Sequence, residues 1–445
     1  MRAREQTASL CPVCLKRLPA CRVPNGRDVR LEKTCPEHGR FSTVIWRGEP
    51  PFSGWQRPKK PSRPPECRTP VQAGCPFDCG LCPDHAQHTC TALLEVTQRC
   101  NLHCPVCFAA TGTPSQDPPL DELTRRLASI RKQAGACTLQ ISGGEPTLRQ
   151  DLPEILSQAA DLGFGLVQLN TNGLRFAQDP GYAGRLRHAG LQSVFLQFDS
   201  LEEAQVARLR SRGLVKEKKR AIQAMAQAGL GIVLVPTLVP GINTDQIGEL
   251  LRFAISGHPA VRGIHFQPIS YFGRYPDTPD EEDRLTLPEI IRHLETQSLG
   301  AVQEGDFLPP GCEHALCSFH ASYMVGPDRA LKPLGQTCCG SEPIEAADGA
   351  RQTVRMTSQK WQLPPAPDPS SLIGADDLDR FLAAARYQTF TVSAMAFQDA
   401  WTLDLERLQG CCIHVSAPDG RLIPFCAYNL TAADGRPLYR KKAGA

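Results

Sequence analysis

The feature that most constrains this chain is its content of 20 cysteines in 445 residues. They gather in short clusters whose spacing suits metal ligation. The N-terminus, MRAREQTASLCPVC, lacks the apolar core of a signal peptide, and no apolar run approaches the roughly 20 residues of a membrane span. We therefore expect a cytoplasmic protein without a transmembrane segment, whose cysteines bind metal rather than form a disulfide framework.

One cluster follows a short apolar run in LEVTQRCNLHCPVCFA, residues 94–109. Cys100, Cys104 and Cys107 have the spacing CxxxCxxC. Each iron of a [4Fe–4S] cluster takes one external ligand, so three cysteines leave one iron open to a substrate or cofactor. This pattern predicts an iron–sulfur site with an open iron at the end of a buried strand.

Strand-like and helical patterns alternate through residues 91–300. The strand-like runs lie at residues 92–97, 137–141, 165–170, 192–197, 231–236 and 262–267. Helical patterns lie between them at residues 120–135, 151–163, 216–229 and 244–257. Repeated strand–helix units predict an α/β fold with a parallel sheet, here a partial or full (β/α) barrel. In such barrels the chemistry sits at the carboxyl ends of the strands.

Polar motifs follow these strands in turn. SGGEPT comes after the second, NTNG after the third, QFDS after the fourth and PTLVPGIN after the fifth. Each motif alone is typical of a turn, but four in register predict one shared site. The paired glycines let the backbone approach a ligand closely. The candidate ligand-binding residues are Ser142, Gly143, Gly144, Glu145, Asn172, Gln197, Asp199, Ser200 and Thr237.

The three-cysteine loop and the GGE motif one strand–helix unit later resemble those of the radical S-adenosylmethionine (SAM) superfamily. The resemblance implies that Cys100, Cys104 and Cys107 carry the catalytic [4Fe–4S] cluster, whose open iron binds SAM. One electron then cleaves SAM to methionine and a 5′-deoxyadenosyl radical, and a reductant such as ferredoxin or flavodoxin supplies that electron.

The same resemblance assigns roles around SAM. Glu145 would take the ammonium group, the QFDS residues would bond the ribose hydroxyls, and Thr237 would line the adenine. Many family members place an aromatic residue against the adenine just before the third cysteine. Here Val106 occupies that position and Phe108 follows the cysteine, which changes the packing of the adenine but not the ligation of the cluster.

Residues 1–49 form a first unit with two metal-binding knuckles. CPVC supplies Cys11 and Cys14, and CPEHG supplies Cys35 and His38. Two such knuckles joined by a hairpin are typical of a zinc-ribbon or rubredoxin-like module. The Cys₃His set favours zinc over iron, and a cysteine-rich loop without metal is the alternative.

Two further cysteine groups predict auxiliary sites. Residues 50–90 combine a proline-rich linker with CPFDCGLCPDHAQHTC, and we expect one auxiliary [4Fe–4S] cluster there. Its expected ligands are Cys75, Cys79, Cys82 and Cys90. Residues 301–445 are expected to form a C-terminal cluster domain with a helix at 374–388. A second zinc site in place of one cluster is the alternative. The expected C-terminal ligands are Cys312, Cys317, Cys338 or Cys339, Cys411 or Cys412, and Cys426.

The order of these motifs along nearly the whole chain is similar to that of the tetraether lipid synthase branch and of related radical SAM (seleno)proteins. That resemblance implies hydrogen abstraction from an inert C–H bond, with carbon–carbon or carbon–sulfur bond formation on an apolar or lipid-like substrate. Modification or methylation of a small molecule, peptide or partner protein is an alternative, as is a non-enzymatic iron–sulfur electron carrier. A net charge of +3 and the absence of aromatic interleaving argue against a nucleic-acid partner.

Overall fold

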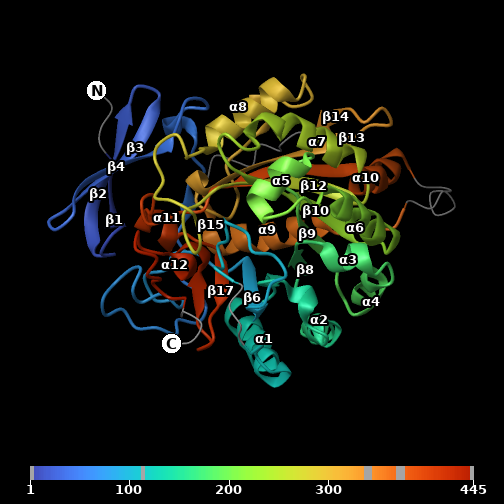
Figure 1. Cartoon of the computed structure of the whole chain (residues 1–445), viewed down its shortest axis with the longest axis horizontal. Coiled ribbons are helices and arrows are strands. Elements are labelled where there is room, and N and C mark those ends of the chain that lie inside the picture. The colour runs from blue at the N-terminus through green and yellow to red at the C-terminus, as the bar shows by residue number, and fades with distance from the viewer. Residues whose placement is uncertain (1–4, 112–115, 335–342, 367–375, 441–445) are drawn as a thin grey trace.

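The computed structural model describes residues 5–111, 116–334, 343–366 and 376–440. A small N-terminal sheet lies beside a large α/β unit, and C-terminal segments lie between the two (Figure 1). Within the described residues no helix is both long and apolar enough to cross a membrane.

The N-terminal sheet is a four-stranded antiparallel meander. Its strands pair in sequence order as β1 (Glu5–Leu10), β2 (Arg17–Asn25), β3 (Asp28–Cys35) and β4 (Gly39–Trp46). Alternate residues of β2 and β3 are buried, as expected for a sheet with one covered face. The short β1–β2 and β3–β4 turns carry the two predicted knuckles to the same end of the sheet.

The central sheet is built from parallel strands that follow the predicted runs. They are β6 (Thr91–Thr97), β7 (Thr138–Gly143), β8 (Leu166–Thr171), β9 (Ser193–Gln197), β10 (Gly231–Val235) and β12 (Val261–Pro268). These strands lie side by side in that order, with the short β11 (Thr237–Leu238) paired to β12. The predicted strands of the core are therefore confirmed.

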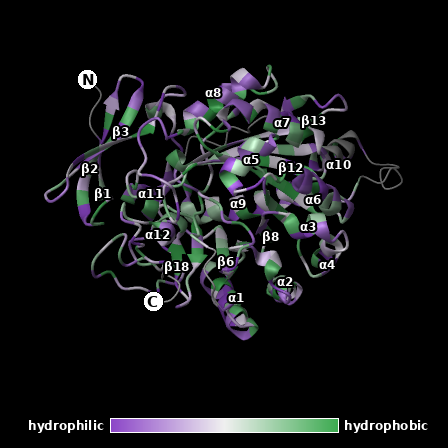
Figure 2. Ribbon diagram, viewed as in Figure 1, coloured by the Kyte–Doolittle hydropathy of each residue, from purple (hydrophilic) through white to green (hydrophobic). Residues whose placement is uncertain are grey.

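Helices cover the outer face of this sheet, and the longer ones each bury one apolar stripe. In α1 (Leu120–Ala134) the buried residues Leu123, Leu127 and Ile130 recur at helical spacing. Figure 2 shows both apolar and polar stripes on α1 and α2. The other helices of this part are α2 (Leu152–Asp161), α3 (Leu174–Gln178), α4 (Tyr182–His188), α5 (Glu203–Arg210), α6 (Val215–Gln227), α7 (Ile247–Ser256) and α8 (Leu287–Gln297), with 3₁₀ turns η2 (Pro146–Leu148), η3 (Thr244–Gln246) and η4 (Glu304–Asp306).

The expected domain boundary at residue 300 is not a break in the sheet. Strand β16 (Thr389–Met395) pairs in parallel with β12, and β17 (Ile413–Ser416) pairs in parallel with β6. The C-terminal residues therefore extend the partial barrel at both edges, because these strands bury apolar faces that a separate domain would expose. The remaining C-terminal elements are β13 (Ser318–Val325), β14 (Leu331–Pro333), β15 (Ile344–Glu345), β18 (Leu422–Pro424), η5 (Ala315–Cys317), α9 (Ala346–Trp361), α10 (Asp377–Gln388), α11 (Leu405–Gln409) and α12 (Phe425–Asn429).

The predicted linker is packed against this C-terminal part. After η1 (Phe52–Gly54), β5 (Lys59–Lys60) pairs in parallel with β15. The indole of Trp55 is buried and donates a hydrogen bond to the carbonyl of Ala315 at 2.9 Å. The N-terminal sheet is joined to the C-terminal residues by an ion pair in which Arg22 Nε lies 2.7 Å from the carboxylate of Asp404.

Candidate active site and metal centres

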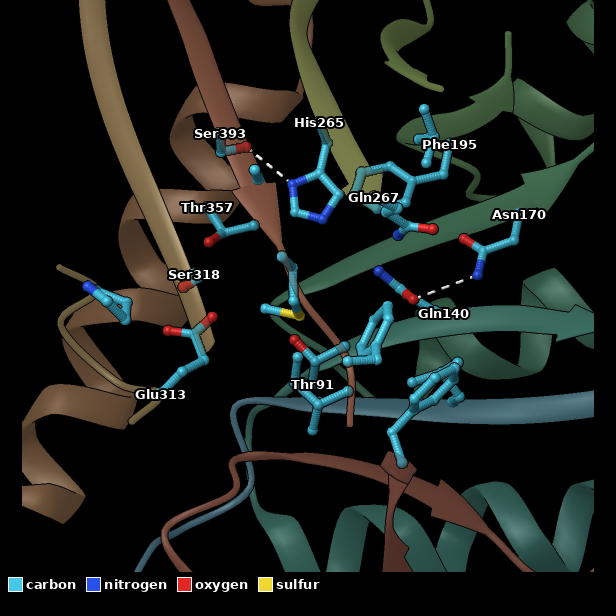
Figure 3. Close-up of a pocket in the computed structure, with 18 of the residues that line it drawn as sticks. Thr91, Gln140, Asn170, Phe195, His265, Gln267, Glu313, Ser318, Thr357 and Ser393 are labelled. Carbon is cyan, nitrogen blue, oxygen red and sulfur yellow. Dashed lines mark hydrogen bonds between the residues drawn. The ribbon is translucent and has the colours of Figure 1, made fainter. Parts of the chain in front are cut away.

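A cavity of about 1060 Å³ fills the interior of the barrel. Side chains from β6, β7, β8, β9, β12, β13, β16 and α9 line it (Figure 3). The three-cysteine loop also borders it. Cys100, Cys104 and Cys107 all reach this cavity, as do Ser142, Gly143, Gly144 and Glu145. The two motifs that the sequence analysis placed at successive strand ends thus share one site.

The three-cysteine loop, residues 98–108, is anchored by Arg274. Main-chain hydrogen bonds of 2.9 Å join Cys107 and Arg274 in both directions, and the Arg274 side chain donates to the carbonyl of Cys104 at 2.9 Å. Burial raises the pKa of the Cys100 thiol to about 11, with a further contribution from Glu145, Cys104 and Cys107 nearby. Cys104 is buried and Cys100 and Cys107 are half-buried in this loop, and all three border the cavity. Three thiols on one loop form a donor set that suits a [4Fe–4S] cluster.

The GGE motif binds the same loop through its backbone. Gly144 N donates to the carbonyl of Thr97, and Glu145 N donates to that of Arg99, each at 2.8 Å. A Cβ on Gly144 would lie 2.1 Å from the Arg99 oxygen, and one on Gly143 would lie 2.2 Å from the Thr97 oxygen. Only glycine allows the two loops to approach this closely.

The carboxylate of Glu145, predicted to bind the ammonium group of SAM, is already hydrogen-bonded to the protein. Its carboxylate accepts hydrogen bonds from the backbone and hydroxyl of Thr147, the hydroxyl of Thr171 and the backbone of Asn172, at 2.6 to 3.1 Å. Burial raises the pKa of Glu145 and these bonds oppose the rise. Glu145 therefore ties the ends of β7 and β8 together, while the same buried carboxylate borders the cavity.

The remaining predicted SAM-binding residues divide into two groups. Phe108, Asn172, Gln197 and Thr237 line the cavity. Asp199 and Ser200 are not among the residues that line it, so the predicted direct contact of these two residues with the ribose is corrected.

The buried partners of Asp199 and Ser200 explain this correction. Asp199 pairs with Arg210 through two hydrogen bonds of 2.6 and 2.7 Å, and the hydroxyl of Ser200 donates to Gln246. Arg210 lines the cavity and was missed, because nothing in the sequence pairs it with an aspartate eleven residues earlier.

A buried cysteine trio reaches the same cavity through Cys90. The Sγ atoms of Cys90, Cys312 and Cys412 lie within 4.8 Å of one another, and Cys90 also lines the cavity. Hydrogen bonds from Cys312 and Cys412 lower the pKa of the Cys90 thiol, whereas burial raises the pKa of its two partners. The prediction that Cys90 completes the set of Cys75, Cys79 and Cys82 is wrong, because strand pairing of β17 with β6 brings Cys412 to Cys90 instead.

The other predicted ligands form two further groups. Cys75, Cys79 and Cys82 surround a small hollow beside Pro424. Cys317, Cys411 and Cys426 lie near one another, and burial, with Cys317 close by, raises the pKa of Cys426 to about 12. Cys312 and Cys317 thus belong to different groups, as do the adjacent Cys411 and Cys412. Cys338 and Cys339 lie outside the described residues.

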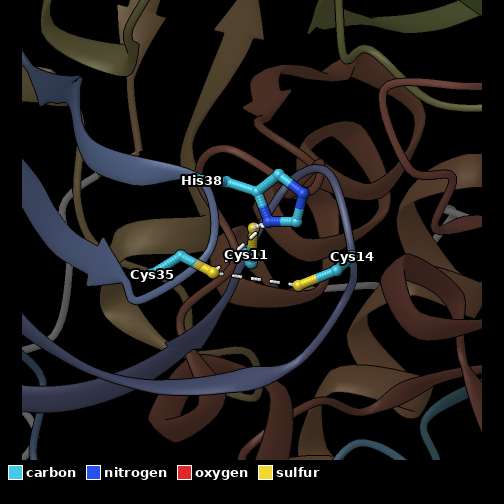
Figure 4. A group of neighbouring side chains, drawn as sticks. All are labelled: Cys11, Cys14, Cys35 and His38. Carbon is cyan, nitrogen blue, oxygen red and sulfur yellow. Dashed lines mark hydrogen bonds between the residues drawn. The ribbon is translucent and has the colours of Figure 1, made fainter.

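The N-terminal knuckles meet in a compact site (Figure 4). Cys11, Cys14, Cys35 and His38 place their ligand atoms within 4.8 Å of one another. The Cys35 Sγ lies 3.4 Å from His38 Nδ1 and 3.9 Å from the Cys14 Sγ. This donor set fits a tetrahedral zinc ion.

We predict that Cys35→Ser lowers bound zinc from about one ion per chain to well below half, because a structural zinc site needs all four ligands. Iron content should remain at the wild-type value, since no described iron-site candidate contacts Cys35. Metal analysis of the purified variant measures both. Loss of iron with retained zinc would contradict the assignment.

Comparison with known proteins agrees with this geometry. Residues 94–254 match the family model of the radical SAM superfamily, and residues 3–47 match the HMPTM N-terminal zinc ribbon domain. The 7,8-dihydro-6-hydroxymethylpterin dimethyltransferase of Methanocaldococcus jannaschii is 34% identical over 96% of this chain and 93% of that protein. A probable GTP 3′,8-cyclase of Archaeoglobus fulgidus is 27% identical over 59% of this chain and 93% of that protein.

Among solved structures, Streptococcus suis SuiB bound to the precursor peptide SuiA overlaps 48% of this chain and 46% of that chain, with a TM-score of 0.40 and 18% identity. These names do not include a tetraether lipid synthase, so that branch stays a prediction. The match along almost the full length of the M. jannaschii protein, together with the radical SAM model, shows the family. The chain belongs to the radical SAM superfamily, whose enzymes use a [4Fe–4S] cluster and S-adenosylmethionine.

Proposed function

We propose that this enzyme removes a hydrogen atom from a C–H bond of a small molecule held in the barrel cavity and joins a carbon substituent to that position. The observation that carries the proposal is the placement of two cysteine sets on one cavity. Cys100, Cys104 and Cys107 line it from one side, and Cys90 of the buried trio lines it from another. A substrate in this space would contact both sets.

The chain's residues fit the cofactors in two respects. The three thiols of residues 98–108 form the donor set for a cluster with an open iron. Gly143 and Gly144 border the same cavity and let the GGE loop pack closely against Thr97 and Arg99. When bound, the cluster and SAM together supply a 5′-deoxyadenosyl radical, which takes up the hydrogen atom from the substrate. We expect Glu145, Asn172, Gln197 and Thr237 to orient SAM.

Arg210 and the buried trio have supporting roles in this proposal. Arg210 lies close enough to Cys104 for the pair to interact, and its ion pair with Asp199 fixes the guanidinium at the cavity wall. Cys90, Cys312 and Cys412 would hold an auxiliary iron–sulfur cluster that exchanges an electron with the substrate radical. A reductant such as ferredoxin or flavodoxin would feed the catalytic cluster.

Transfer of a one-carbon group is the form of this reaction that the M. jannaschii relative suggests through its name, a dimethyltransferase. The test uses anaerobically reconstituted enzyme with SAM, dithionite and 7,8-dihydro-6-hydroxymethylpterin. We expect the pterin to accelerate formation of 5′-deoxyadenosine, and mass spectrometry to detect deuterium in the nucleoside when the pterin carries it. Deoxyadenosine that never acquires substrate deuterium, with this or any tested small molecule, would contradict hydrogen abstraction.

Coupling of an apolar or lipid-like substrate is the second candidate. The observation in its favour is an aromatic wall on the cavity, where Phe425 packs against Phe397, Phe108 and Phe272 with ring centroids 4.4, 5.5 and 6.1 Å away. An alkyl chain would bury apolar surface there. Acceleration of deoxyadenosine formation by an alkyl glycerol ether, and not by heterocycles, would favour this candidate.

A further inference from the structure

The inside of the barrel carries an unusual number of neutral polar side chains. Barrel interiors are commonly filled by Val, Ile and Leu. Here the inward positions of β7, β8 and β12 are Gln140, Asn170, His265 and Gln267, all of which line the cavity (Figure 3). Burying such groups costs free energy unless each finds a hydrogen-bond partner. Their hydrogen bonds, and the polar atoms that have none, indicate which kind of ligand the cavity binds.

A directed chain of side-chain amides crosses three strands. Gln168 Nε2 donates to Ser193 Oγ at 3.0 Å, Gln140 Nε2 donates to Gln168 Oε1 at 2.9 Å, and Asn170 Nδ2 donates to Gln140 Oε1 at 3.3 Å. Each amide therefore donates one of its two N–H groups to the previous residue, and Asn170 Nδ2 also lies 3.5 Å from Ser142 Oγ. The chain ends at Asn170 Oδ1, a buried acceptor with no partner in the described protein.

The cavity wall formed by β12 and β16 carries a second set of polar atoms without hydrogen bonds from the described residues. His265 Nδ1 lies 2.8 Å from Ser393 Oγ, which fixes the ring and leaves Nε2 without a bond from the described residues. The hydroxyl of the neighbouring Thr391 is buried, belongs to a cavity-lining residue and has no hydrogen-bond partner among the described residues. The His265 ring stacks on Phe195 with ring centroids 5.6 Å apart and an interplanar angle of 28°, and Phe195 also packs against Trp361 at 4.9 Å, so this wall is aromatic.

Every member of this polar layer is uncharged. Burial lowers the pKa of His265 to about 4, which keeps the imidazole neutral at pH 7. Gln140 and Asn170 lie one pleat deeper than the candidate SAM-binding residues on the same strands, whereas Gln267 lies beside Thr237. Gln140 precedes Ser142 by two residues, and Asn170 precedes Asn172 by two, a step of about 7 Å along a strand. The layer therefore begins beside the candidate SAM-binding residues, with Asn170 Nδ2 3.5 Å from Ser142 Oγ, and extends deeper into the cavity.

We propose that this layer recognises the substrate, and that the group it takes is a neutral, flat nitrogen heterocycle with a lactam-type edge. A ring N–H would meet the free acceptor Asn170 Oδ1, and the ring face would lie against Phe195. His265 Nε2 and Thr391 Oγ1 would bond other polar atoms of the ring edge. This inference rests on the proposed function and deepens it by naming the substrate class.

Other ligand classes fit this layer poorly. An alkyl chain placed here would leave Asn170 Oδ1 and Thr391 Oγ1 unpaired in an apolar contact, which is costly. A charged head group would find no ionised partner among the layer's described members. The aromatic wall around Phe425 is the better place for any apolar part of the substrate.

Equilibrium dialysis of the anaerobic, reconstituted enzyme with SAM tests the inference. The probes are 7,8-dihydro-6-hydroxymethylpterin, guanine and uracil, with 1,3-dimethyluracil as a ring without N–H groups and dodecanol as an apolar ligand. At least one of the three lactam rings should bind wild-type enzyme with a Kd below about 1 mM. The dissociation constant for that ring should rise about tenfold in Asn170→Ala, because the free acceptor is lost.

His265→Phe and Thr391→Val keep the shape of the wall and provide independent variants if Asn170→Ala folds poorly. Each should weaken binding of the lactam ring about three- to tenfold. Gln178→Ala, which removes an exposed amide on α3, should leave the Kd within about twofold.

Failure of all three lactam rings to bind below about 1 mM would overturn the inference. So would folded variants that all retain the wild-type Kd, or dodecanol or dimethyluracil binding more tightly than every lactam ring. Formation of 5′-deoxyadenosine by the wild-type enzyme is measured beside these assays. Its presence in any of these cases would show that the substrate class, and not the radical reaction, was wrong.

Discussion

Cys104→Ala is expected to abolish cleavage of SAM to 5′-deoxyadenosine and to remove about four irons per chain, the content of one cubane cluster. Cys104 is buried in the three-cysteine loop, and only two thiols of that loop remain after the change. Two thiols leave two irons without a protein ligand, so the cluster is not retained. Bound zinc should stay at the wild-type value because the knuckle residues form a separate site.

Iron, sulfide and zinc analysis of anaerobically reconstituted protein measures the first effect, and chromatography of the deoxyadenosine measures the second. Cys67→Ala is the matched control, since Cys67 is exposed and belongs to none of the described cysteine groups. It should retain wild-type iron and activity. Cys104→Ala protein that cleaves SAM at the wild-type rate would show that the three-cysteine assignment is wrong.

Gly144→Ala is expected to lower the rate of SAM cleavage by about a hundredfold or more. The added Cβ would lie 2.1 Å from the carbonyl oxygen of Arg99, so the three-cysteine loop and the GGE loop must separate. Separation breaks the bonds from Gly144 N to Thr97 and from Glu145 N to Arg99 and displaces the candidate SAM-binding residues. The unfolding free energy should fall by about 1–3 kcal/mol, as for other overpacked buried sites.

Gly184→Ala is the matched control for this prediction. Gly184 lies in α4, is exposed, and has nothing within 4 Å of an added Cβ. That change should leave SAM cleavage intact and stabilise the protein slightly, by up to about 1 kcal/mol, because alanine favours a helix. Equal losses of activity in the two variants would indicate that contact between the loops is not what matters at Gly144.

The sequence predicted the parts of the fold that depend on residues close together in the chain. The six parallel strands of residues 91–268 follow from apolar runs, and their polar carboxyl ends place Cys100, Gly144 and Asn172 in one cavity. The zinc knuckles were equally predictable, because CPVC and CPEHG fix ligand geometry within a few residues. In these cases the residues that determine the structure are neighbours in the sequence.

The parts that distant pairing controls could not be predicted. Cys90 follows Cys82 by eight residues, yet its partners are Cys312 and Cys412, which strand β17 and the segment before η5 bring to it. The sequence predicts that Asp199 binds a ribose. In the structure, the guanidinium of Arg210 on α5 donates two hydrogen bonds to the Asp199 carboxylate and balances its charge. The NTNG motif pointed to Asn170, but Gln140, His265 and Gln267 were missed, because single polar residues within strands give no signal until the strands are placed side by side.

The most direct test of the central claim is formation of 5′-deoxyadenosine by the wild-type protein. The enzyme is reconstituted without oxygen, supplied with SAM and dithionite, and its iron is counted in the same sample. We predict about eight to twelve irons per chain, corresponding to two or three cubane clusters, and deoxyadenosine formed in a time-dependent manner. A sample with that iron content that leaves SAM intact, with and without candidate substrates, would contradict the account.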